Sequence, residues 1–122
     1  MVELKKLQND VYQNKVKHGF NTSSIEMEFC LAYGELGEAY MAYLKKKDDL
    51  GEELADVAIY LLGLSEMLDI DLEKEILHKI EKNSKRVYKE NSKGVLIKEE
   101  ELLGWLKWQI LKKYLESMIT IL

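Results

Sequence analysis

The chain has 122 residues, of which 47% are hydrophobic and 33% charged, and its 22 Asp and Glu outnumber its 18 Lys and Arg, for a net charge of −4. This length fits one domain with one core, and the acidic balance argues against nucleic acid as a partner, because phosphate binding requires an excess of clustered Lys and Arg. The single cysteine excludes a disulfide framework and a thiolate zinc cluster, and a chain without proline and with only 7 glycines is a poor candidate for a hairpin-built fold.

The class that remains is an all-helical bundle, and apolar residues at helical spacing predict its elements. The first helix is expected over residues 2–17, and it should end at Gly19, which can adopt the left-handed conformation that closes a helix. The second helix is expected over residues 24–46, with Ser23 and Glu26 forming a capping box at its start.

Acidic caps mark the next two helices. Asp49 with Glu52 caps a third helix that extends to about residue 68, and Asp71 caps a fourth helix that extends to about residue 90. Residues 91–94, Asn-Ser-Lys-Gly, then interrupt the pattern. Short connections between long helices favour antiparallel neighbours, so the second and third helices should lie side by side.

A C-terminal helix is expected over residues 102–122, with large apolar residues on one broad face. Such a face suits a terminal core helix, a contact between subunits or a membrane surface. Charged residues interrupt it too often for a membrane span, and the mixed charges at the N-terminus do not resemble a signal peptide. We therefore expect a cytoplasmic protein without a membrane partner, with a helical domain over residues 1–98 and a docking or oligomerisation helix over residues 99–122.

Two acidic motifs lie in apolar surroundings. Glu35 and Glu38 on the second helix, and Glu53 and Asp56 on the third, are each three residues apart and therefore share a helix face. Asp56 is the only charged residue in the segment 54–65, and a helix that is apolar all round is a buried helix. We therefore expect Asp56 in the core, where an unpaired carboxylate must be protonated, paired or bound to a cation.

Antiparallel packing of the two helices would bring all four carboxylates together. Like charges at such short distances repel, and a divalent cation is the simplest remedy. Ligation by oxygen alone points to a hard ion, so Mg²⁺ or Mn²⁺ is favoured over zinc. The alternative is that both motifs lie on solvated faces, as acidic pairs commonly do in a chain with this much charge.

Basic residues on the expected fourth helix offer a complement to the acids. Lys79, Asn83 and Arg86 follow one another at four and three residues and would share one stripe of a helix. Two cations beside an amide suit a phosphate chain, since the guanidinium offers a bidentate fork. The alternative is a solvated cluster that the helix dipole favours near the C-terminal end.

The resemblance described next implies a nucleobase, for which the candidate residues are His18, Phe20 and Asn21. An aromatic ring can stack on a base, and an amide can form hydrogen bonds with its edge. The alternatives are that His18 is a surface residue beside a helix end and that Phe20 packs against the next helix.

Taken together, the motifs resemble the MazG-like family of all-α nucleoside triphosphate pyrophosphatases, whose signature is E-x-x-E followed, after a dozen or more residues, by E-x-x-D. The signature falls here on Glu35/Glu38 and Glu53/Asp56, and the resemblance extends over about residues 10–97. Many members carry a further Glu directly before the first motif, where this chain has a glycine.

The resemblance implies an antiparallel helix bundle that hydrolyses a nucleoside triphosphate to the monophosphate and pyrophosphate with Mg²⁺ or Mn²⁺, plausibly to remove unwanted nucleotides from the pool. By position in the motifs, it assigns metal binding to Glu35, Glu38, Glu53 and Asp56, activation of the attacking water to Glu38, and phosphate binding to Lys79, Asn83 and Arg86.

Two other functions compete with this one. A phosphoribosyl-ATP pyrophosphohydrolase is the close enzymatic alternative, and a non-enzymatic helical oligomerisation module is the other. A ferritin-like di-iron protein needs two Glu-x-x-His motifs, and this chain has one, at Glu75 and His78. The expected partners are a nucleoside triphosphate and further copies of the chain in a homodimer or homotetramer.

Overall fold

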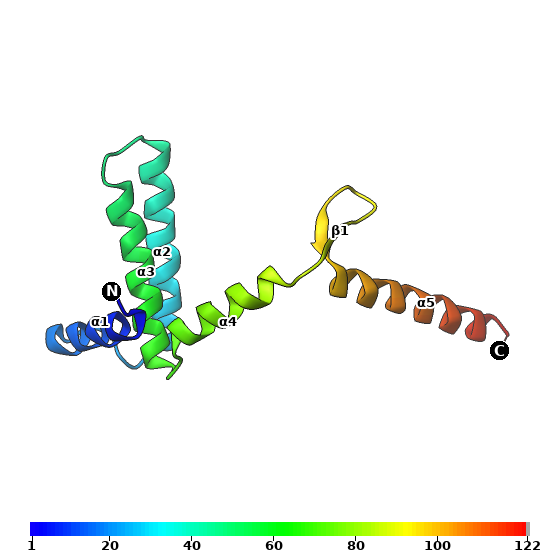
Figure 1. Cartoon of the computed structure of the whole chain (residues 1–122), viewed down its shortest axis with the longest axis horizontal. Coiled ribbons are helices and arrows are strands. Elements are labelled where there is room, and N and C mark those ends of the chain that lie inside the picture. The colour runs from blue at the N-terminus through cyan, green and yellow to red at the C-terminus, as the bar shows by residue number, and fades with distance from the viewer. Residues whose placement is uncertain (122) are drawn as a thin grey trace. The chain divides into compact units, whose positions relative to one another are not determined.

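The computed structural model describes residues 1–121, with no side chains described at residues 101, 102 and 121. The expected last residue of the C-terminal helix, Leu122, lies outside the described residues. The fold is all-α with one short antiparallel strand pair, as Figure 1 shows. Its elements are α1 (Leu4–His18), α2 (Ile25–Leu44), α3 (Leu50–Met67), α4 (Leu72–Ser84), β1 (Tyr88–Glu90), β2 (Leu96–Lys98) and α5 (Glu99–Ile121).

The chain forms two compact units, Met1–His78 and Lys79–Leu122. In the first unit, α2 and α3 run antiparallel side by side, and α1 packs against α3 (Figure 1). This confirms the predicted pairing of the second and third helices. Its buried apolar residues are few among the described residues: two alanines on α2, Ala39 and Ala42, and two leucines on α3, Leu62 and Leu64.

The helix ends of the first unit follow local chemistry. Gly19 closes α1 with a φ of +69°, as predicted. At the start of α2 the predicted capping box is wrong by one residue: Ser24 is the cap, and its Oγ accepts a hydrogen bond from the Met27 amide at 3.2 Å. Asn21 Oδ1 accepts from the Ser23 and Ser24 amides, and this turn places Ser23 before the helix.

The caps of the next two helices differ. Asp49 precedes α3 as predicted, but its side chain forms no cap hydrogen bond, because its backbone (φ −91°, ψ 12°) departs from the extended cap conformation. Asp71 caps α4 as predicted, with Oδ1 accepting from the Lys74 amide at 3.1 Å.

A buried glutamine joins α1 to the turn between α3 and α4. Gln8 is fully buried; its Nε2 donates to Glu66 Oε2 at 2.8 Å and to the Ile70 carbonyl at 2.6 Å, and its Oε1 accepts from the Leu72 amide at 3.2 Å. Three hydrogen bonds from one side chain fix the position of α1 where the apolar core is small.

The prediction that α3 is buried all round is wrong for the single chain. Leu54, Ile59 and Leu61 on this helix are each about half exposed, and Asp56 is only partly buried. The physical reason is that α3 contacts α1 and α2 on two sides, while its remaining apolar surface has no cover among the described residues.

In the second unit, the predicted fourth helix ends earlier than expected, at Ser84 rather than near residue 90. Residues 88–90 pair with residues 96–98 instead, and Asn91 turns the chain by accepting from the Lys93 and Val95 amides through its Oδ1. Gly94 supplies a φ of +76° that other residues rarely adopt. The turn chemistry therefore outweighed the helical spacing.

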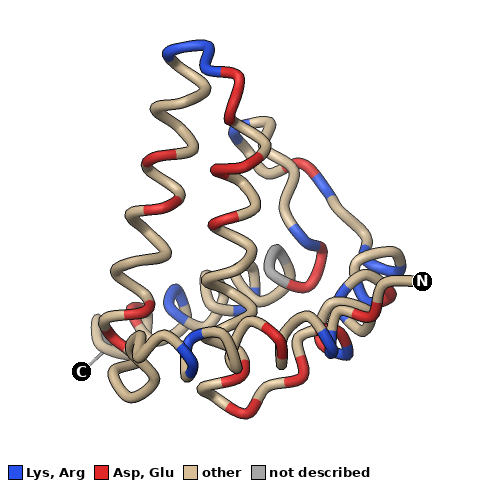
Figure 2. Tube along the Cα trace, turned by 90° about the vertical axis from the view of Figure 1, so that its left-hand side faces the viewer, with Lys and Arg blue, Asp and Glu red and all other residues tan. Residues whose placement is uncertain are grey.

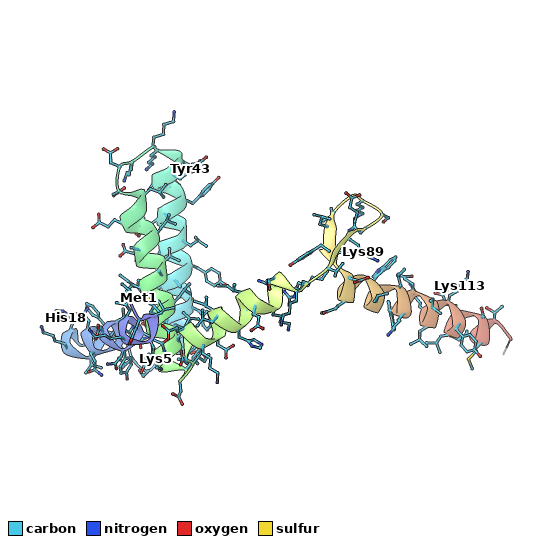
Figure 3. The ribbon with its side chains drawn as sticks, viewed as in Figure 1. Met1, Lys5, His18, Tyr43, Lys89 and Lys113 are labelled. Atoms are coloured by element: carbon cyan, nitrogen blue, oxygen red, sulfur yellow. The ribbon has the colours of Figure 1, made fainter. Side chains whose placement is uncertain are left out.

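The last element, α5, confirms the predicted C-terminal helix, although it begins three residues earlier. Its described large apolar side chains are all substantially exposed, and Lys113 extends away from it in Figure 3. Among the described residues, no helix combines the length and the apolar character that crossing a bilayer requires.

Candidate functional site

Three acidic side chains converge where α2 faces α3. Glu35 and Glu38 lie one turn apart on α2, and Glu53 lies near the start of α3; each offers a carboxylate oxygen, and these oxygens all lie within 4.8 Å of one another. Figure 2 shows acidic positions, in red, on facing stretches of these two helices. The antiparallel pairing of α2 and α3 thus brings together two motifs that are distant in sequence.

The fourth predicted acid, Asp56, lies one turn beyond Glu53 on α3. It is not among the acids whose oxygens meet within that distance, but its negative charge raises the pKa of both Glu35 and Glu53. Asp56 therefore contributes to the same electrostatic field from a partly buried position.

The acids disfavour one another's ionisation. Burial raises the pKa of Glu35 first, and the charges of Glu38, Asp56 and Glu53 add to the effect. The pKa of Glu53 is raised by burial, then by Asp49, Glu38 and Asp56, with Lys47 acting in the opposite direction. Negative charges therefore meet at this place, and among the described residues Lys47 is a cation that opposes their effect on Glu53.

Unpaired oxygens mark the same group. Glu35 Oε2, Glu53 Oε2 and Asp49 Oδ1 are buried and have no hydrogen-bond partner among the described residues. Buried carboxylate oxygens normally have hydrogen-bond or ionic partners. The unpaired oxygens of this group are therefore available to bind a positively charged ligand. An all-oxygen donor set fits a hard divalent cation such as Mg²⁺ or Mn²⁺.

The three predicted phosphate-binding residues form a cationic cluster in the second unit. Arg86 lies beyond the end of α4, so the predicted single helical stripe is wrong, because the chain leaves the helix at Ser84. Its Nη1 still donates to Asn83 Oδ1 at 2.7 Å, and its buried Nε has no partner among the described residues. The charge of Arg86 is the main cause that lowers the pKa of Lys79, followed by burial and the charges of Lys82 and Lys98.

A cavity of about 590 Å³ lies among α1, α2 and α3. The predicted base-binding residues meet it in part: Phe20 and Asn21 line it, and the His18 ring stacks on Phe20 with centroids 5.4 Å apart. Its lining consists of Asp10, Val11, Asn14, Lys15, Phe20, Asn21, Met27, Glu28, Leu31, Ile59 and Tyr60.

Asn21 is already engaged by its own loop. Its Nδ2 donates to the Ser24 carbonyl at 2.8 Å and to Glu28 Oε1 at 3.1 Å, and its Oδ1 accepts from two backbone amides. Its role in base binding stays a prediction, and the observed role is to shape the loop before α2.

Five polar residues that line the cavity were not predicted from the sequence: Asp10, Asn14, Lys15, Glu28 and Tyr60. A signal for Lys15 was present, because it follows Val11 by four residues and so falls on the apolar stripe of α1. A charged residue on such a stripe indicates a buried ion pair, whose partner is found only in the folded chain.

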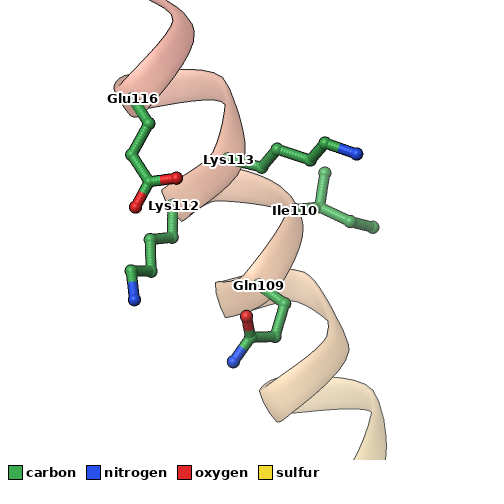
Figure 4. Close-up of a pocket in the computed structure, with 5 residues that line it drawn as sticks. All are labelled: Gln109, Ile110, Lys112, Lys113 and Glu116. Carbon is green, nitrogen blue, oxygen red and sulfur yellow. The ribbon is translucent and has the colours of Figure 1, made fainter. Parts of the chain in front are cut away.

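A second depression lies on α5, lined by Gln109, Ile110, Lys112, Lys113 and Glu116 (Figure 4). All five side chains come from one helix, which gives the depression a single wall. It therefore lacks the enclosure of a small-molecule site.

The fold and the acidic group define an all-α protein with a candidate cation site between two antiparallel helices. No protein-family model and no curated protein matches the chain. Among solved structures, the chain is similar to the MazG-like pyrophosphohydrolase of cyanophage S-2L, which was solved bound to dGDP and three catalytic Mn²⁺ ions per active site. The two sequences are 21% identical, and the structures superpose with a TM-score of 0.60. The match covers 80% of this chain and 98% of that chain. The likeness confirms the predicted MazG-like all-α fold.

Proposed function

We propose that the chain is a nucleotide pyrophosphohydrolase that depends on a divalent cation and converts a nucleoside triphosphate and water to the monophosphate and pyrophosphate. The observation that carries the proposal is the meeting of the Glu35, Glu38 and Glu53 oxygens within 4.8 Å, with unpaired buried oxygens among them. The solved structure with this fold, a pyrophosphohydrolase bound to dGDP and Mn²⁺, supports the choice of reaction.

Glu35, Glu38, Glu53 and Asp56 would hold the cation, Mg²⁺ or Mn²⁺. When bound, the ion neutralises these carboxylates and stabilises the negative charge that develops on the phosphate oxygens in the transition state. Glu38 is the exposed member of the three meeting acids. We assign to it the orientation of the attacking water and acceptance of its proton, while the water oxygen bonds to the α-phosphorus and pyrophosphate leaves with the bridging oxygen.

The cluster of Lys79, Asn83 and Arg86 suits phosphate groups. Arg86 offers a guanidinium that Asn83 orients through their 2.7 Å hydrogen bond, and mutual repulsion with Lys79 would be relieved by an anion. We assign the nucleoside part of the substrate to the 590 Å³ cavity, whose lining combines apolar and aromatic side chains with six polar or charged residues.

We also propose that the chain works as a homodimer or homotetramer. Large apolar side chains on α2 and α3 are exposed in the single chain, among them Tyr33 (74%), Tyr40 (61%) and Leu54 (52%). Tyr43 points away from the helix pair in Figure 3. A soluble protein rarely leaves so much apolar surface in water, and sedimentation measurements would test the prediction by giving a mass above 14.3 kDa.

The decisive experiment is pyrophosphate release from a panel of ribo- and deoxyribonucleoside triphosphates, with Mg²⁺, with Mn²⁺ and with a chelator. The proposal expects release that needs the cation. Activity on phosphoribosyl-ATP alone would favour the alternative enzyme. Inactivity on every nucleotide, by a folded protein with the cation present, would favour a non-enzymatic oligomerisation module.

A further inference from the structure

A positively charged segment lies between the middle of α4 and the start of α5. Residues 79–98 contain seven basic residues and two acidic ones, although the whole chain has a net charge of −4. The basic residues are Lys79, Lys82, Lys85, Arg86, Lys89, Lys93 and Lys98. The segment belongs to the second compact unit and includes the β1–β2 hairpin. Charge of one sign that is concentrated in one part of a chain of opposite net charge favours an anionic ligand there.

The hairpin presents its lysines on two different faces. Tyr88 pairs with Lys98, and Lys89 pairs with Ile97. Because side chains alternate along a strand, Tyr88 and Lys98 project from one face of the hairpin and Lys89 from the other. Lys89, labelled in Figure 3, forms an ion pair with Glu99, whose Oε1 lies 3.0 Å from its Nζ. This pair is on the face opposite Lys98, as the alternation requires.

Arg86 is on the same face as Lys98. The ladder continues past β1, because the Glu99 amide donates to the Val87 carbonyl at 2.8 Å. Arg86 precedes Tyr88 by two residues, and the alternation therefore places it beside Tyr88 and diagonally across from Lys98. Diagonal neighbours on one face of an antiparallel pair are roughly 7–8 Å apart, within reach of long side chains.

The cations of this face lie close enough to affect one another. Arg86 is the main cause that lowers the pKa of Lys79, followed by burial and by the charges of Lys82 and Lys98. Arg86 is held by Asn83, which accepts from its Nη1 at 2.7 Å, and its buried Nε has no partner among the described residues. Cations that repel one another and a donor without an acceptor are both stabilised by a bound anion.

We infer that Lys98 is a further phosphate-binding residue, which the hairpin brings beside Lys79 and Arg86 to hold the same phosphate chain. The guanidinium offers a fork to one phosphate group, and the two ammonium groups can each donate to the oxygens of another. The hairpin thus returns the chain to α4 with an additional cation, which lies just past the segment of about residues 10–97 that carries the family resemblance. The inference deepens the proposed function and rests on it for the nucleotide to which the phosphate chain belongs.

The first test uses inorganic tripolyphosphate as the probe. Calorimetric titration of the full chain in chelator, which separates the cations from the metal chemistry of the acidic group, should detect binding by the wild type. Lys98→Met should weaken binding at least tenfold, the loss of one charge-assisted hydrogen bond, whereas Lys98→Arg keeps the charge and should bind within about threefold of the wild type.

Lys89→Met is the matched control, because it removes a lysine from the same hairpin but from the opposite face. It should bind tripolyphosphate as the wild type does. Wild-type affinity in Lys98→Met, or no binding by the wild type, would overturn the inference. Equal losses in Lys98→Met and Lys98→Arg would also overturn it, because they would show that Lys98 supports the fold of the hairpin instead of binding phosphate.

The two proposals fail in different ways. If the wild type hydrolyses nucleotides and Lys98→Met has the same KM, the role of Lys98 is wrong and the enzyme stands. If the wild type hydrolyses no nucleotide but only Lys98→Met loses tripolyphosphate binding, the reaction is wrong and the phosphate site stands. The expected result for Lys98→Met is a KM raised at least tenfold with kcat within about twofold, which is the pattern of lost ground-state and transition-state binding alike.

Discussion

Two regions of α2 carry buried or partly buried acids, Glu28 and Glu35, only two helical turns apart. The negative charges of these two acids have different surroundings. Glu28 is almost fully buried and forms an ion pair with Lys15 of α1. Glu35 faces Glu38 and Glu53, and its pKa is raised by burial and by those negative charges. The first region contains a cation of the chain in contact with its acid, whereas no ion pair is found for Glu35, Glu38 or Glu53 among the described residues. The difference indicates that a cation from solution would be needed to neutralise the acids of the second region.

The largest effect should come from removing the internal cation. Lys15→Met leaves Glu28 buried without a positive partner, and we expect the free energy of unfolding, measured in urea, to fall by about 3–5 kcal/mol. Adding Glu28→Leu should restore most of this loss. A loss below about 1 kcal/mol, the range of an exposed pair, would show that the pair is not buried in solution.

Removing an acid of the second region should abolish activity. Glu53→Gln keeps the shape but loses a ligand charge, and we expect the rate of pyrophosphate release to fall at least about 100-fold. The control is Glu52→Gln, the exposed neighbouring acid, which should keep wild-type activity. Loss of activity in both variants would argue against a specific role for Glu53.

Adding the external cation should stabilise the wild type. At a hundredfold excess over Kd, Mn²⁺ or Mg²⁺ should raise the free energy of unfolding by about 2.7 kcal/mol, seen as a higher Tm that a chelator reverses. Glu53→Gln should show a smaller rise. An identical rise in both proteins would place the ion elsewhere.

Without the cation, the second region should make stability depend on pH. The pKa values of Glu35 and Glu53 are raised in the folded chain, so their favourable contribution is complete below the unfolded pKa and is lost as the pH rises through the folded values. In chelator, the Tm of the wild type should therefore fall relative to Glu35→Gln/Glu53→Gln as the pH rises above the ordinary glutamate value of 4.5. A constant difference would contradict the raised pKa values.

The smallest effect concerns the start of the helix that carries both regions. Ser24→Ala removes the cap of α2 and should cost about 1 kcal/mol, whereas Ser23→Ala should cost only a few tenths. Thermal unfolding of the two variants compares them directly. A larger loss of stability in Ser23→Ala than in Ser24→Ala would identify Ser23 as the cap, as the sequence predicts.

The acidic region between α2 and α3 could largely be predicted from the sequence. The spacing of Glu35/Glu38 and Glu53/Asp56 placed each pair on one helix face, and the short connection between the helices predicted that the faces would meet. Asp56 was expected in the core because its neighbours are apolar, but periodicity cannot tell whether an apolar face meets the same chain or another. Arg86 was expected on α4, but the pairing of residues 88–90 with 96–98 depends on a partner strand beyond the turn.

By itself, the sequence determined the helices, most of their ends, and which acids share a face, because helical spacing, caps and glycine conformations act within a few residues. Only the tertiary structure decided which acid is neutralised. Whether an acid of α2 meets a lysine, as Glu28 does, or other acids, as Glu35 does, depends on the approach of α1 and α3 to α2. Distances between segments far apart in the chain are set by packing of the whole unit.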